Sequence, residues 1–173
     1  MMHFYAWDAA LNCAPSFPPP QGLTTQIWRP HAWSVHPEGL PVFPYAVWTG
    51  FHHLGLFSNR EYGVVVLREG AQVVHSSLVT PRYARFPVMG SKDLQIGATY
   101  TVPAWRGRGL ARAAIGLVCR AWAGRFERLW YIVGEENAAS IRVVEACGFR
   151  LAGTGARVRR FGLSILAQYR ILP

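Results

Sequence analysis

Cysteine is scarce in this chain, and its pattern excludes two common ways of stabilising a small fold. The three thiols, Cys13, Cys119 and Cys147, are too few and too widely spaced for a disulfide framework, and their spacing fits no zinc site. His52 and His53 are adjacent, so on an extended chain they point to opposite faces, and no His-x-x-x-His pair occurs. We therefore expect no bound metal, and we expect Cys119 and Cys147 to pack as small apolar groups.

Long apolar runs are also absent. No run reaches the ~18 residues that a membrane-spanning helix needs. The first residues, Met1 to Asp8, lack the basic segment of a secretory signal peptide. We therefore expect a cytoplasmic protein with no membrane partner. The length of 173 residues suits one domain, and no repeat or linker is evident, so we expect a single domain over residues 1–173.

Acidic residues are few, and Lys92 is the single lysine, so the formal net charge is +9 and rests on arginine. Such a balance favours a polyanionic partner, either nucleic acid or a phosphate-bearing small molecule. Arg157-Val-Arg-Arg160 is a short basic cluster, but Arg157 and Arg159 alternate along an expected strand and so fit a solvated sheet face. A polyanionic cofactor near residues 106–112 would explain part of the charge, and nucleic acid is the less favoured partner.

The most informative segment, Val102 to Ala111, places a glycine-containing turn between a strand-like run and an amphipathic helix. Residues 94–102 are rich in β-branched and aromatic types, and a proline directly after them ends the ladder. Apolar residues then recur at helical spacing from Leu110 to Ala121. The first N–H groups of such a helix lack internal partners, and the helix dipole adds positive charge, so this junction favours an anion.

Two better-known phosphate loops do not fit this turn. The P-loop needs Lys followed by Ser or Thr after its last glycine, and Leu110-Ala111 stands there instead. The dinucleotide-binding fingerprint needs a third glycine, and Arg112 occupies that place.

A second signal lies downstream at a compatible distance. Residues 128–134 have the pattern of a buried strand, Asn137 is a good N-cap for a short helix, and Gly148 is a natural C-cap. Capping alone would explain Asn137 and Ser140, and this structural interpretation stays open beside a functional one.

Three motifs in order, Arg106-x-x-Gly109-x-Ala111, Asn137-x-x-Ser140 and Gly148-Phe149, resemble the GNAT superfamily of acyl-CoA N-acyltransferases. The resemblance covers about residues 60–171. It implies an α/β (α+β) fold with a mixed, mostly antiparallel central sheet flanked by helices. It also implies acetyl-CoA as the acyl-donor co-substrate, with its pyrophosphate on the turn backbone. The cofactor-binding residues expected from it are Thr101, Val102, Arg106, Gly107, Arg108, Gly109, Leu110, Ala111, Asn137 and Ser140.

The general acid departs from the family pattern. Many members carry a Tyr seven residues after the motif Asn, and Val144 occupies that place. Ser140 lies one turn earlier on the same helix face and is our candidate to hydrogen-bond the leaving sulfur.

The general base also departs from it. Many relatives supply a Glu from the strand that corresponds to residues 94–102, which contains none and has Gln95 near that place. Candidates elsewhere are His75, His52, His53 and Asp93, because an imidazole pKa of about 6.5 suits proton removal at neutral pH. His75 stands in a hairpin strand beside the expected core and is our candidate base, with a packed histidine and a water chain as the alternatives.

The chain divides into an unusual front and a regular back. Residues 1–61 are rich in proline and tryptophan and are expected to form a folded cap or extension over a core of residues 62–171. Within the cap, Val47 to Phe57 is a candidate helix. The back is expected to follow the order β-β-β-α-β-α-β-β, from a hairpin that starts at Tyr62 to a last hairpin around Gly162.

The expected reaction is transfer of an acetyl group to a primary amine of a small molecule. Aromatic residues of the front and of Pro81 to Pro87 are candidates for a pocket wall, with Arg82 or Arg85 to clamp an anionic or amino-sugar acceptor. Alternatively, the same aromatic residues fill the core of the cap. A protein N-terminal or ribosomal-protein acetyltransferase and a non-catalytic acetyl-CoA sensor are the other hypotheses. Exposed aromatic residues would mark a homodimer interface.

Overall fold

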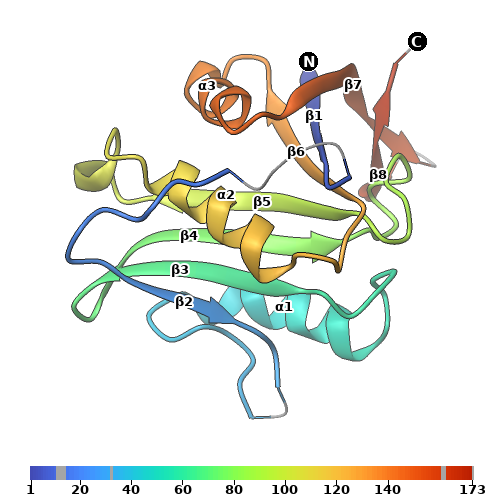
Figure 1. The fold of residues 1–173 in the computed structure, drawn as a ribbon. Helices are drawn as coiled ribbons and strands as arrows, with labels where there is room; N and C mark the ends of the chain where they lie inside the picture. The colour runs from blue at the N-terminus through green and yellow to red at the C-terminus, as the bar shows by residue number, and fades with distance from the viewer. Residues whose placement is uncertain (11–14, 32, 161–162, 173) are drawn as a thin grey trace.

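A single eight-stranded sheet with the strand order β2-β3-β4-β5-β6-β1-β7-β8 organises the molecule (Figure 1). The structure is a computed structural model that describes residues 1–10, 15–31, 33–160 and 163–172. The strands are β1 (Met2–Asp8), β2 (Thr24–Trp28), β3 (Gly63–Glu69), β4 (Gln72–Pro81), β5 (Leu94–Thr101), β6 (Arg128–Gly134), β7 (Arg150–Arg160) and β8 (Leu163–Ile171). The helices are α1 (Val42–His53), the short 3-10 helix η1 (Pro103–Trp105), α2 (Leu110–Ala121) and α3 (Ala138–Ala146).

From β3 onward, the elements follow the order that the family resemblance implies. β3 and β4 form a hairpin, β5 leads through η1 into α2, β6 leads into α3, and β7 pairs with β8. The mixed, mostly antiparallel sheet flanked by helices confirms the expected fold class. The turn expected around Gly162 lies outside the described residues, as does Cys13.

Strand β1 lies inside the sheet, antiparallel to β6 on one side and to β7 on the other. Phe4 is 0% exposed in a cluster on one sheet face, and Tyr5 and Trp7 are buried in the core on the other face. This differs from the expectation that residues 1–61 cap a core of residues 62–171. A strand buried on both faces loses the alternation of apolar and polar residues, so its aromatic content alone does not distinguish it from a covering segment.

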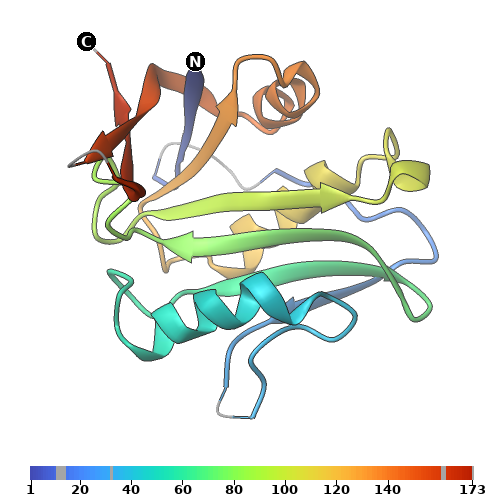
Figure 2. The ribbon, with the colours of Figure 1, turned by 180° about the vertical axis from the view of Figure 1, so that it is seen from behind.

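Helix α1 covers the sheet face opposite α2 (Figure 2). It packs on a second core cluster that includes Trp28 at the end of β2. This part of residues 1–61 therefore does cover the sheet. The helix occupies Val42–His53 rather than the expected 47–57, and Gly55, with a φ of 68°, follows its end in the left-handed conformation that stops a helix.

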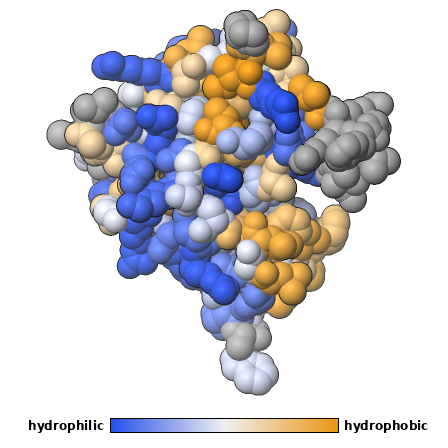
Figure 3. All heavy atoms as spheres, turned by 90° about the vertical axis from the view of Figure 1, so that its right-hand side faces the viewer, coloured by the Kyte–Doolittle hydropathy of each residue, from blue (hydrophilic) through white to orange (hydrophobic). Residues whose placement is uncertain are grey.

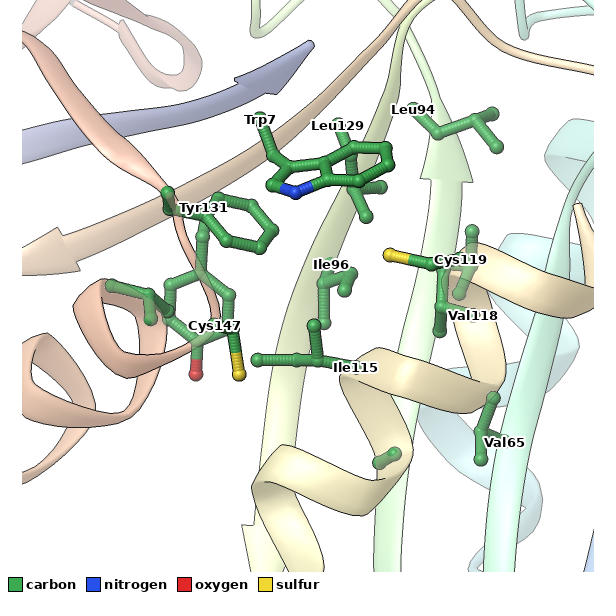
Figure 4. Close-up of a cluster of buried hydrophobic side chains, with 14 of the residues drawn as sticks. Trp7, Val65, Leu94, Ile96, Ile115, Val118, Cys119, Leu129, Tyr131 and Cys147 are labelled. Carbon is green, nitrogen blue, oxygen red and sulfur yellow. The ribbon is translucent and has the colours of Figure 1, made fainter. Parts of the chain in front are cut away.

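The main core lies between the sheet and helices α2 and α3, as Figure 4 shows in part. Ile115 of α2 is buried with Ile96 of β5 and Leu129 of β6. Burying such a side chain is worth ~1.5–3 kcal/mol, so the contact fixes α2 against the two central strands. Cys119 and Cys147 are buried in this core, and burial raises their pKa values to about 12 and about 11, as expected of packed, unreactive thiols.

Several apolar side chains are exposed on the surface. Figure 3 shows apolar side chains gathered on part of one face, and near α1 Phe43 and Leu54 are each 75% exposed. A homodimer interface at such a surface stays a prediction. Within the basic cluster, the side chains of Arg159 and Arg160 lie outside what the structure describes. None of the helices in the described part of the chain is both long and apolar enough to cross a membrane.

Candidate functional site

Strands β5 and β6 separate part-way along their length. They pair in parallel from Leu94–Leu129 to Ile96–Tyr131, and the register stops there. β5 then carries a bulge against β4, where Ala98 adopts a φ of 43°. A bulge bends a strand and increases its twist, and the two strands diverge beyond this point (Figure 1). Their facing edges are therefore open to a ligand.

A cleft of about 640 Å³ lies at this divergence. Its walls come from the end of β5, the turn before α2, the start of α2, β6 and α3. The residues expected to bind the cofactor that line it are Thr101, Arg106, Gly107, Gly109, Leu110, Ala111, Asn137 and Ser140. The fold thus brings the two sequence motifs, which are separate along the chain, to one cleft.

The turn that precedes α2 has the geometry of an anion site. Gly107 and Gly109 have φ values of 77° and 82°, a left-handed conformation that glycine adopts without strain. Gly109 is the N-cap of α2, and no side chain caps the helix. The first helix N–H groups and the positive end of the helix dipole are therefore available to an anion. The first turn holds no acidic residue, and Arg106 and Arg112 line the same cleft.

Val102 and Arg108, both expected to bind the cofactor, are not among the residues that line the cleft. The backbone N–H of Val102 donates to the carbonyl oxygen of Val74 over 3.0 Å, so β4 already uses this donor and it is not available to the cofactor. The guanidinium of Arg108 lies over the ring of Trp105, 4.5 Å from its centroid. Of the two arginines in this turn, Arg106 therefore lines the cleft and Arg108 does not.

Asn137 and Ser140 combine a capping role with a place in the cleft wall. The Oδ1 of Asn137 accepts a hydrogen bond from the backbone N–H of Ser140 over 3.1 Å, which confirms the capping interpretation. Both residues also line the cleft. The cap uses the backbone of Ser140 and leaves its hydroxyl for another partner.

His75 is buried in the sheet and is not part of the cleft surface. Its side chain is 0% exposed, with Nδ1 2.7 Å from Oγ1 of Thr101 and Nε2 2.9 Å from Oγ of Ser77. Burial lowers the pKa of His75 to about 4, so the ring is neutral near neutral pH and is a weak base. His75 therefore does not fit the expected role of a base that contacts the amine, because it reaches the cleft only through other side chains, Thr101 on one side and Ser77 with Thr99 on the other.

The other candidate bases lie away from the cleft. His52 and His53 end α1, on the opposite face of the sheet from α2. Asp93 is buried and accepts hydrogen bonds from the backbone N–H of Gly90 and from Nε1 of Trp130, both over 2.7 Å. This carboxylate therefore joins a loop to β6. Across the described ranges, no group of three or more His, Cys, Asp or Glu is placed to hold a metal ion.

Sequence reasoning missed three hydroxyl-bearing residues of the cleft wall, Thr99, Tyr100 and Tyr131. Tyr131 is 8% exposed, and in the view of the core in Figure 4 its phenol oxygen and the sulfur of Cys147 point in the same direction. None of the hydrogen bonds found among the described residues involves that phenol. The spacing of Tyr131 and Leu129 places both on the same face of β6, and the sequence alone shows this. The position of Tyr131 where β6 diverges from β5 depends on the strand register, which the sequence does not show.

A family model described as an acetyltransferase (GNAT) domain matches residues 27–150. The chain belongs to the GNAT acetyltransferase family. This match confirms the resemblance drawn from the three sequence motifs. No curated protein matches the chain.

Solved structures of GNAT proteins share the fold. A putative GNAT acetyltransferase from Novosphingobium aromaticivorans is 22% identical, with a TM-score of 0.57, over 87% of this chain and 59% of that one. A GCN5-related N-acetyltransferase from Kribbella flavida is 15% identical, with a TM-score of 0.52, over 86% of this chain and 53% of that one. AAC(6')-Iy, in complex with the bisubstrate analogue CoA-S-monomethyl-acetylneamine, is 16% identical, with a TM-score of 0.54, over 79% of this chain and 98% of that one. This GNAT chain thus spans little more than half the length of the first two.

Proposed function

We propose that this GNAT family member transfers an acetyl group from acetyl-CoA to the primary amine of a small molecule in the cytoplasm. The observation that best supports the proposal is the uncapped start of α2, which opens onto the cleft between the diverging strands β5 and β6. The turn at Gly107 and Gly109, with Arg106 and Arg112 beside it, suits the pyrophosphate. The open edge of β5 suits the pantetheine arm.

Acetyl transfer requires attack of a neutral amine on the thioester carbonyl carbon and departure of the sulfur. The nitrogen–carbon bond forms, the carbon–sulfur bond breaks, and its electron pair goes to the sulfur. Two cleft hydroxyls suit protonation of that sulfur, the hydroxyl of Ser140 on α3 and the phenol of Tyr131 on β6. A thiol pKa of about 8.5 makes the thiolate a moderate leaving group, so one such donor is sufficient help.

The proton of the ammonium form leaves by another route. The described residues that line the cleft include no Asp, Glu or His. Two of the candidate bases, Asp93 in the loop before β5 and His75 in β4, are both engaged in hydrogen bonds inside the protein. We therefore assign proton removal to water in the cleft, one of the alternatives open from the sequence.

The acceptor site is less defined by side chains than the acetyl-CoA site. The aromatic residues expected to form its wall contact one another on the sheet face that α1 covers, with ring centroids 5.4 to 6.4 Å apart. These residues are Trp48, Phe51, Phe57 and Tyr83. They pack in the core beneath α1. Phe57 and Tyr83 also line a hollow of about 470 Å³ with Arg82, and this hollow shares no residue with the cleft. The acceptor proposal therefore rests on the basic charge of the chain and on the open cleft.

The direct test is an acetyltransfer assay with a panel of amines. The panel contains neamine-type amino sugars, amino-sugar phosphates, and peptides with free N-termini. Released CoA thiol is counted, and the acetylated product is identified by mass spectrometry. Turnover of an amino sugar supports the proposal. Turnover of peptides alone would identify a protein acetyltransferase, and tight acetyl-CoA binding without any turnover would identify a sensor; both results would overturn it.

A further inference from the structure

Four side chains form a continuous hydrogen-bonded chain beneath the cleft. Oγ1 of Thr101 lies 2.7 Å from Nδ1 of His75, and Nε2 of His75 lies 2.9 Å from Oγ of Ser77. That hydroxyl in turn lies 3.2 Å from Oγ1 of Thr99. Both ends, Thr99 and Thr101, line the cleft, whereas His75 and Ser77 are 0% and 1% exposed. The chain therefore begins and ends at the same ligand site.

A neutral imidazole carries one N–H donor and one acceptor nitrogen, so its tautomer fixes the direction of both bonds that the ring makes. With the proton on Nδ1, His75 donates to Thr101 and accepts from Ser77, and Ser77, its proton used, accepts from Thr99. The hydroxyl proton of Thr101 is then free for the cleft, and Thr99 presents an oxygen lone pair. With the proton on Nε2, His75 accepts from Thr101 and donates to Ser77; when the freed Ser77 proton goes to Thr99, the two threonines exchange these roles.

We propose that His75 is a positioning residue that gives Thr99 and Thr101 opposite hydrogen-bonding polarity toward the cleft. One threonine donates to the ligand while the other accepts, and the tautomer of the ring decides which. The inference rests on the proposed acetyl transfer, because a thioester carbonyl oxygen needs a donor and an amine N–H needs an acceptor. A buried ring that stays neutral near neutral pH keeps the two hydroxyls complementary there.

Nitrogen NMR of histidine-labelled protein tests the chain directly, because the shifts of the two ring nitrogens report charge and tautomer. The signals of His75 are assigned by their loss in His75→Gln. We expect a neutral ring between about pH 5.5 and pH 8, and a single tautomer once acetyl-CoA is bound. A ring that titrates like an exposed histidine, or a mixture of both tautomers in the acetyl-CoA complex, would overturn the inference.

Three variants test its consequence for turnover. Thr99→Val and Thr101→Val each remove one hydroxyl with little change of shape, and His75→Gln interrupts the centre. Each is expected to lower kcat by about tenfold, the size of one lost hydrogen bond, with a smaller change in KM for acetyl-CoA. Ser76→Ala is the matched control, since Ser76 is equally buried in β4 but its neighbouring position places it on the other sheet face.

A double variant distinguishes a coupled hydrogen-bonded chain from contacts that act independently. The effects of His75→Gln and Thr101→Val should not add, because both interrupt the same bonds. Additive effects, or a folded His75→Gln protein with the kcat of the wild type, would overturn the inference. Failure of the wild type to acetylate any amine would instead contradict the proposed function, and the NMR titration of His75 would still decide the chain.

Discussion

The Nε of Arg106 donates a hydrogen bond to the carbonyl oxygen of Thr101 over 3.2 Å. This bond joins the turn before α2 to the last residue of β5. It therefore holds the anion site and the open strand edge in a fixed relation, which a ligand that carries both a pyrophosphate and an extended arm requires. Arg108, two residues later, lies over the ring of Trp105 and is not itself among the residues that line the cleft.

Arg106→Ala should weaken acetyl-CoA binding by about tenfold, because it removes a charge beside the proposed pyrophosphate site and the bond to Thr101. Arg108→Ala removes the same charge from the same turn and is expected to change the affinity by less than about threefold. Calorimetric titration of each variant with acetyl-CoA measures the difference. Equal losses would show that the turn acts only through its total charge.

Tyr131→Phe should lower kcat by about tenfold or more, with little change in thermal stability, if the phenol helps the sulfur to leave. Tyr5→Phe is the control, because the hydroxyl of Tyr5 donates to Glu145 and is not part of the cleft lining. It should cost about 1 kcal/mol of stability and leave kcat unchanged. Steady-state kinetics and thermal unfolding are measured on both. A Tyr131→Phe enzyme with wild-type kcat would leave Ser140 as the remaining donor.

Stability should fall in mild acid because His75 is buried in its neutral form. Its pKa is about 4 when folded and 6.5 when unfolded, so below pH 6.5 the unfolded chain binds a proton that the native protein does not. The free energy of unfolding should thus decrease as pH falls through that window, by up to about 3 kcal/mol. Urea unfolding of the wild type and of His75→Gln across this range measures it. Parallel profiles would show that other groups cause the loss.

Phe4→Ala should destabilise the protein by about 3–5 kcal/mol, since Phe4 is 0% exposed in the centre of the sheet. Phe43→Ala, at a side chain that is 75% exposed, should change stability by less than about 0.5 kcal/mol. Chemical denaturation compares the two. A small effect at Phe4 would mean that β1 contributes little to the core, as would a cap over a core formed by residues 62–171.

The contrast between α2 and β1 shows how far the sequence predicts this fold. The turn and helix after Val102 are set by local signals, namely a proline, glycines and helical spacing, and the structure confirms them. The place of β1 between β6 and β7 is set by pairing between residues more than a hundred positions apart, such as Phe4 and Ile132, and no local pattern encodes it.

In the candidate site, too, some features follow from local sequence and others from the pairing of distant strands. The anion turn at Gly107 and Gly109 follows from conformational preferences of the residues themselves. The burial of His75 and the exposure of the Tyr131 phenol to the cleft follow from strand register and from the bulge in β5. A histidine on a strand has the same local pattern whether its face is wet or covered by a helix, so its role was not predictable from sequence.

Calorimetric titration of acetyl-CoA into the wild type, Gly109→Ala and Gly109→Glu tests the central claim most directly. Both substitutions carry the backbone strain of a φ of 82°, and a Cβ at this position meets only Arg112 Nη2, at 3.7 Å. Only the glutamate adds a negative charge where the pyrophosphate is proposed to lie. We predict binding by the wild type and by Gly109→Ala, and loss of binding in Gly109→Glu while the protein remains folded. Equal affinity in both variants, or no binding to the wild type at millimolar acetyl-CoA, would contradict the account.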